Sequence, residues 1–121
     1  MSIEECYEQM GGSYKDVLSR IPSEELVKRF LALFLNDKSF NELGSAVKSK
    51  DREAAFIASH TLKGVCANLG LSDLCKSVSV LTEVLRPKTE NIASECYTLF
   101  EKVTQDYQKT ITIISKGLAD N

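Results

Sequence analysis

The hydrophobic residues of this chain recur at intervals of three and four along most of its length. Between residues 52 and 69 the pattern is Ala55, Ala58, Leu62, Val65 and Leu69. This spacing places apolar side chains on one face of an α-helix, which has about 3.6 residues per turn. No segment sustains the alternation of a half-buried strand, and no Asn-Gly or Asp-Gly hairpin signal occurs. The pattern therefore predicts an all-α fold.

Capping residues, glycines and prolines divide the chain into predicted helices. The prolines Pro22 and Pro87 separate helical patterns, because proline cannot continue the backbone hydrogen bonding of a helix. Gly70 is expected to end one helix in the left-handed conformation, and Gly117 to end the last one. The predicted ranges are 2–9, 14–20, 23–36, 39–49, 52–69, 72–86 and 89–115.

Four of these predicted helices, those over 39–49, 52–69, 72–86 and 89–115, are amphipathic and joined by short connections. Such helices favour an antiparallel up-down four-helix bundle, here with additional short N-terminal helices. A chain of 121 residues fits one domain. We expect this single domain to comprise N-terminal helical segments over 1–36, main bundle helices over 37–116 and a polar tail over 117–121.

The overall composition excludes several classes of protein. The net charge of −2 gives no reason to expect a nucleic-acid partner. No apolar run approaches the roughly 18 residues of a membrane-spanning helix. The first five residues lack the basic and apolar regions of a signal peptide. We therefore expect no membrane association and a cytoplasmic location.

Neither the cysteines nor the acidic residues form a known catalytic or metal-binding pattern. The four cysteines are scattered, and with one histidine they match no zinc spacing. Gly11 and Gly12 follow no predicted strand, so we interpret them as a hinge rather than a nucleotide-binding loop. The acidic pairs Glu4–Glu5 and Glu24–Glu25 suit helix N-termini. The chain is therefore predicted to be no enzyme and to hold no metal or cofactor.

The only histidine, His60, lies on an unusual helix face. At about 100° per residue it points away from the apolar stripe, with Lys63 and Gly64 within one turn of it. A glycine inside a helix costs about 0.5–1 kcal/mol relative to alanine, and Gly64 removes bulk beside His60. A neutral imidazole is a nucleophile that can accept a phosphoryl group, whose charge Lys63 could stabilise. The alternative is an exposed histidine without a role.

The motif around this histidine resembles the signature of the histidine-containing phosphotransfer (Hpt) domain family. It reads His60-Thr61-Leu62-Lys63-Gly64, followed by Ala67-Asn68-Leu69-Gly70 and Leu74. The resemblance implies a phosphocarrier of a two-component phosphorelay, phosphorylated on Nε2 of His60. It further implies that Lys63 contacts the phosphoryl group and that Gly64 admits the partner. Expected partners are a response-regulator receiver domain, which would carry Mg²⁺ itself, and a sensor histidine kinase.

The resemblance also directs attention to residues around His60. Related domains often place a Gln or Glu on the partner helix to hydrogen-bond Nδ1 of the histidine. Here that position, 22 residues after His60, is Thr82, with Glu83 beside it and Ser79 as a further candidate. Apolar residues on the outer helix face often mark an interaction site. The predicted docking face for the receiver domain comprises Phe56, Ile57, Gly64 and Ala67.

Two other functions fit a helical bundle. A non-transferring helical adaptor would bind a receiver or kinase domain without accepting a phosphoryl group, but the intact His60, Lys63 and Gly64 argue against it. A fragment of a larger kinase would need an ATP-binding domain, which these 121 residues lack. We therefore expect a free-standing monomer, although the apolar outer face would also permit a dimer.

Overall fold

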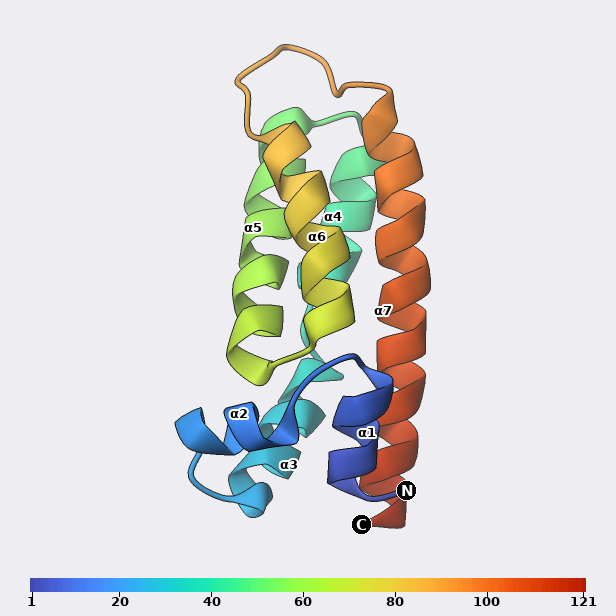
Figure 1. The fold of residues 1–121 in the computed structure, drawn as a ribbon. Coiled ribbons are helices and arrows are strands. Elements are labelled where there is room, and N and C mark those ends of the chain that lie inside the picture. Colours follow the sequence, from blue (N-terminus) through green and yellow to red (C-terminus); the bar gives the residue numbers. More distant parts are fainter.

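The computed structural model describes the whole chain, residues 1–121, as seven α-helices without a strand (Figure 1). The prediction of an all-α fold is confirmed, and each of the seven predicted segments contains a helix. The helices are α1 (Ile3–Gln9), α2 (Tyr14–Arg20), α3 (Glu24–Phe34), α4 (Ser39–Lys48), α5 (Arg52–Leu69), α6 (Ser72–Leu85) and α7 (Glu95–Asp120).

Helices α4 to α7 form a four-helix bundle in which consecutive helices run in opposite directions (Figure 1). Helix α5 packs against α4 and α6, and α7 packs against α6 and α4. Each of the four helices contributes side chains that are fully buried between them, among them Leu43, Leu62, Leu81 and Val103. The burial of these apolar side chains stabilises the bundle.

The three N-terminal helices pack at one end of this bundle. Helix α1 lies against the C-terminal part of α7, and α2 and α3 lie below the turn between α5 and α6 (Figure 1). The two chain ends meet there. The amino group of Met1 donates to Oδ2 of Asp120 at 2.8 Å, and Nδ2 of Asn121 donates to the Met1 carbonyl at 2.7 Å.

The connection between α1 and α2 is packed tightly against the turn between α5 and α6. Gly70 ends α5 with a φ of +70°, as predicted, and the hydroxyl of Tyr7 donates to the Leu69 carbonyl at 2.7 Å. A Cβ on Gly12 would lie only 2.5 Å from the Gly70 carbonyl oxygen. The interpretation of Gly11 and Gly12 as a hinge is therefore wrong, because Gly12 allows two backbone segments to approach closely and a Cβ on Gly11 would collide with the Asp73 side chain.

The last helix differs from its prediction at both ends. It begins at Glu95 instead of Thr89, and the preceding residues form a loop at the top of the bundle (Figure 1). It continues through Gly117 to Asp120, so most of the predicted tail over 117–121 is helical. Gly117 is buried, and a Cβ there would collide with Sγ of Cys6. The glycine thus accommodates α1 and does not end α7.

The buried face of α5 is also rotated slightly from the predicted stripe. Val65 is only half-buried, whereas Ser59 and Cys66 are fully buried. The reason is that α5 packs between α4 and α6. The side chains that point between these two neighbours are therefore the ones that lose contact with water.

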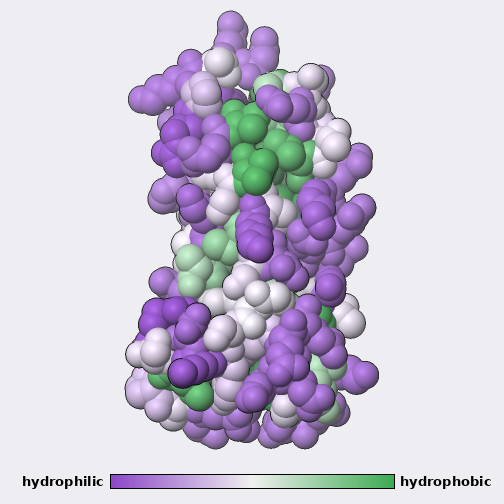
Figure 2. Space-filling view, in the orientation of Figure 1, coloured by the Kyte–Doolittle hydropathy of each residue, from purple (hydrophilic) through white to green (hydrophobic).

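The molecular surface is mostly hydrophilic on the side shown in Figure 2, with an apolar area over the upper part of α6 and smaller apolar areas near the lower end. Val80 of that helix has an exposed fraction of 53%. None of the helices combines the length and the hydropathy that a membrane-spanning segment requires.

Candidate functional site

His60 lies in the middle of α5 on its outer, exposed face. Helix α5 begins at Asp51, whose side chain caps it by accepting a hydrogen bond from the Ala54 amide at 3.1 Å. The neighbours Ser59 and Leu62 are fully buried and hold this part of the helix against the bundle. Neither ring nitrogen of His60 has a hydrogen-bond partner within the chain. The imidazole is therefore accessible from outside and is carried by a rigid element.

Lys63 and Gly64 lie within one turn of His60, as their spacing predicted. Lys63 is half-buried and forms no ion pair with another residue of the chain. Gly64 is exposed, and a Cβ built on it would have no neighbouring atom within 4 Å. The surface beside the imidazole thus combines one cation that forms no ion pair with open space.

The three candidates for orienting His60 make other hydrogen bonds. Thr82 is fully buried, and its hydroxyl donates to the Val78 carbonyl at 2.7 Å. The hydroxyl of Ser79 donates to the Cys75 carbonyl at 2.6 Å. Glu83 pairs with Arg86. The structure therefore contradicts the orienting role for Thr82, because this residue is on the core face of α6.

An aromatic ring lies against His60 instead. The Phe56 ring, one turn earlier on α5, has its centroid 5.8 Å from that of the imidazole, at an interplanar angle of 47°. The guanidinium carbon of Arg86 also lies over the Phe56 ring, 5.1 Å from its centroid. Phe56 is consequently half-buried beside His60 and Arg86, whereas an open docking face requires exposed side chains.

Arg86 did not stand out in the sequence as a site residue. It ends α6, and its guanidinium donates to the Glu83 carboxylate at 2.8 Å. This hydrogen bond holds the pKa of Glu83 below its usual value, with smaller contributions from the charges of Arg86, Lys63 and a protonated His60. No local pattern connects Arg86 with Phe56, because their contact depends on how α6 is aligned against α5.

The remaining predicted docking residues are exposed on α5. Ile57 has an exposed fraction of 57%, and Gly64 and Ala67 are also exposed. These residues surround His60 along about three turns of the helix. They leave a face of small and apolar side chains on which another protein could approach the imidazole.

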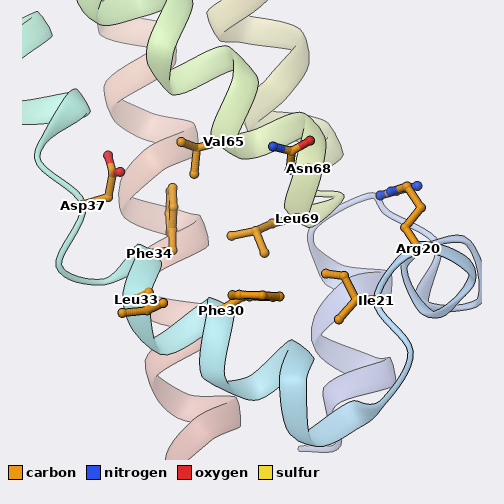
Figure 3. Close-up of a pocket in the computed structure, with 9 residues that line it drawn as sticks. All are labelled: Arg20, Ile21, Phe30, Leu33, Phe34, Asp37, Val65, Asn68 and Leu69. Carbon is orange, nitrogen blue, oxygen red and sulfur yellow. The ribbon is translucent and has the colours of Figure 1, made fainter.

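This face adjoins a hollow of about 450 Å³ between α3 and the C-terminal part of α5. Figure 3 shows Phe30 and Phe34 of α3 opposite Val65 and Leu69 of α5, with Arg20 at one side. Leu33, which also lines the hollow, has an exposed fraction of 60%. On the other side of α3, Leu31 is fully buried and Leu35 is half-buried against the core. The open side of this helix is therefore the one that carries Phe30 and Leu33.

No group of three or more His, Cys, Asp or Glu side chains is arranged to hold a metal ion. The four cysteines are free thiols. Burial raises the pKa of the Cys66 thiol, which makes this sulfur a poor nucleophile. The imidazole of His60, by contrast, is an exposed nucleophile on the outer face of α5.

A family model for the Hpt domain matches residues 25–111. Comparisons with curated proteins and with solved structures found no match. Hpt domains are phosphocarriers that interact with receiver domains and histidine kinases in two-component phosphorelays. The match covers the α5 motif and most of the bundle, and it confirms the resemblance inferred from the residues around His60. The chain belongs to the Hpt domain family.

Proposed function

We propose that this protein is a histidine phosphotransfer protein in which His60 is the phosphoryl acceptor. It would receive the group from the aspartyl phosphate of a receiver domain, or from a histidine kinase, and pass it to another receiver domain. The observation that carries this proposal is the exposed imidazole on α5, without an internal hydrogen bond, beside an unpaired Lys63 and an open Gly64.

The transfer requires a neutral imidazole with its proton on Nδ1. The lone pair of Nε2 attacks the phosphorus of the aspartyl phosphate and forms the N–P bond. The P–O bond to the aspartate breaks, and the carboxylate leaves with the electron pair. The new phosphoryl group carries about 1.5 to 2 negative charges near neutral pH, as phosphorylated side chains do. Lys63 would stabilise this charge from one turn away. Attack by an aspartate of a second receiver domain reverses the step.

The partner would supply the rest of the chemistry. Phosphoryl transfer depends on positioning and on cations that neutralise the developing charge. This chain offers Lys63 but no set of carboxylates arranged around a metal. We therefore place the Mg²⁺ on the receiver domain, and we propose that this chain carries the group without turnover of its own.

The same geometry supports a docking position for a receiver domain. Its aspartate must reach His60, so the domain would cover the outer face of α5 around Gly64. Ile57 and Ala67 would lie beneath it. The hollow lined by Phe30 and Leu33 adjoins that face and could receive an apolar side chain of the partner. These residues add α3 to the docking face predicted from α5 alone.

The test is to incubate the purified protein with phosphorylated receiver domains from the same organism. We expect label that is stable in alkali and labile in acid, as phosphohistidine is. His60→Gln should take up no label while keeping its helix content and melting temperature, because His60 is exposed. Thr61→Ala is the matched control, since Thr61 is an exposed neighbour and its loss leaves the acceptor in place.

Two outcomes would contradict the proposal. If the folded wild-type protein bound receiver domains but took up no label from any of them, the adaptor function would replace it. If His60→Gln retained the label, a different residue would be the acceptor.

A further inference from the structure

The carboxylate of Glu83 lies beside two cations, Arg86 and Lys63. The Glu83 carboxylate accepts hydrogen bonds from Nη2 of Arg86 at 2.8 Å and from Nε at 3.1 Å. Both side chains are about half exposed. An exposed ion pair of this kind contributes little to stability. Stabilisation of the fold therefore does not explain why Glu83 and Arg86 are placed together.

Arg86 and His60 both lie against the ring of Phe56. The guanidinium lies over Phe56, and Phe56 in turn lies against His60. A guanidinium over an aromatic face is attracted by the negative charge of that face. Arg86 is exposed at the end of α6, and exposed side chains change rotamer readily, so its guanidinium can exchange Glu83 for another acceptor.

Glu83 interacts electrostatically with the same site. The positive charges that lower its pKa include Lys63 and a protonated His60, in addition to Arg86. In the unphosphorylated protein these opposite charges attract. Once His60 carries a phosphoryl group, Glu83 and that group repel one another and compete for the same two cations.

We infer that Arg86 is a second residue that binds the phosphoryl group on His60, and that Glu83 competes with this group for Arg86. The inference rests on the proposed role of His60 as the acceptor. The planar guanidinium binds phosphate oxygens through two parallel hydrogen bonds. A phosphoryl group carries more charge than a carboxylate, so it takes Arg86 from Glu83. Phe56 positions Arg86 for this exchange.

The decisive experiment is an exchange reaction that requires no protein partner. The purified protein is mixed with phosphoimidazole, and ³¹P NMR measures the equilibrium between phosphorylated His60 and phosphoimidazole. In this exchange one N–P bond forms at Nε2 of His60 and another breaks, releasing imidazole. The equilibrium constant reports how well the chain stabilises the phosphorylated histidine.

The inference predicts shifts of opposite sign for the two members of the pair. Arg86→Gln should shift the equilibrium away from His60 by about threefold to fivefold, the size expected of one exposed charge pair. Glu83→Gln should shift it towards His60 by a similar factor. Arg86→Lys should recover part of the loss, since it keeps the charge but not the planar fork. The Nε–H signal of Arg86 should also move when the wild-type protein is phosphorylated.

A matched control is the exposed pair of Lys102 and Asp106 on α7, whose atoms are 2.9 Å apart. Lys102→Gln and Asp106→Asn should leave the exchange unchanged. If Glu83→Gln and Arg86→Gln moved the equilibrium in the same direction, or not at all, the pair would be a structural contact only. If the wild-type protein exchanged with phosphoimidazole but with no receiver domain, the proposed function would fail while this test still decided the role of Arg86.

Discussion

Gly64 and Gly117 both lie inside long helices, yet their surroundings are opposite. Gly117 of α7 is buried where α1 crosses it, and any Cβ would collide with Sγ of Cys6. Gly64 of α5 is exposed, and a Cβ there would have no atom within 4 Å. One glycine is required by the packing of the chain, whereas nothing within the chain requires the other.

This difference separates requirements of the fold from requirements of the site. Glycine inside a helix costs about 0.5–1 kcal/mol relative to alanine. At Gly117 the close packing of α1 against α7 offsets this cost. At Gly64 no internal contact does so, and the glycine keeps open the surface beside His60. The absence of a side chain therefore favours the approach of a partner at this point on α5.

The largest loss of stability is expected from Gly117→Ala. The added methyl group would force α1 away from α7, and overpacking of this kind costs about 1–3 kcal/mol. Urea unfolding would measure the difference in free energy. Combining it with Cys6→Ala, which removes the colliding sulfur, should recover part of the loss. An unchanged unfolding midpoint for Gly117→Ala would show that α1 is not tightly held.

Gly64→Gln should damage transfer without damaging the fold. A long side chain beside His60 would displace the receiver domain, and a displacement of about 1 Å can cost up to 10²-fold in rate. We expect transfer from a phosphorylated receiver domain to slow by about tenfold or more. Phosphoimidazole is small and should still load His60. Equal losses with both donors would indicate damage to His60 itself instead of a steric block.

Tyr7→Phe tests the hydrogen bond that connects α1 with the end of α5. The Tyr7 hydroxyl donates to the Leu69 carbonyl, and the loss of one such bond costs about 1 kcal/mol. Burial raises the pKa of Tyr7 above its usual value of 10.0. At a pH just above 10, the Tyr7 hydroxyl therefore keeps its proton in the folded state and loses it in the unfolded state.

The sign of the resulting pH dependence follows from this difference. The contribution of Tyr7 to stability is fully present below the ordinary tyrosine pKa of 10.0 and decreases as the pH rises above it. In chemical unfolding between pH 8 and about pH 11, Tyr7→Phe should lose stability less steeply than the wild-type protein. Parallel pH profiles would show that Tyr7 ionises equally in both states.

The smallest effect, and the only gain, is expected from Gly64→Ala. The methyl group meets no atom of the chain, so the helix should gain about 0.5–1 kcal/mol. Thermal unfolding would detect it as a raised melting temperature. A loss of stability here would show that Gly64 has a structural role like that of Gly117.

Much of the fold could be predicted from local signals. The bounds of α2 and α5 agree with their predictions, and Ser2, Ser13, Ser23 and Asp51 cap helices through their side chains. The error at the end of α7 has a clear cause. A glycine near the end of a periodic segment usually marks a helix end, and the sequence does not show that α1 packs against Gly117.

The features of the candidate site also separate into those that local signals predict and those that depend on contacts between helices. His60, Lys63 and Gly64 share one face of α5, which periodicity alone predicts. The contact of Phe56 with Arg86, the core position of Thr82 and the hollow beside α3 involve pairs of helices. Their prediction requires the rotation and axial shift of one helix relative to another, and no local pattern specifies these.

The sequence by itself thus determined the helical class, most helix ends and the face that carries the acceptor histidine. These depend on hydrogen bonds and periodicity within a few residues along the chain. Only the tertiary structure decided which side chains of α6 and α3 stand beside that histidine, and which glycine the fold itself requires. Those outcomes depend on close packing between segments distant in sequence, where rotating a helix by one residue, about 100°, brings a different side chain into the site.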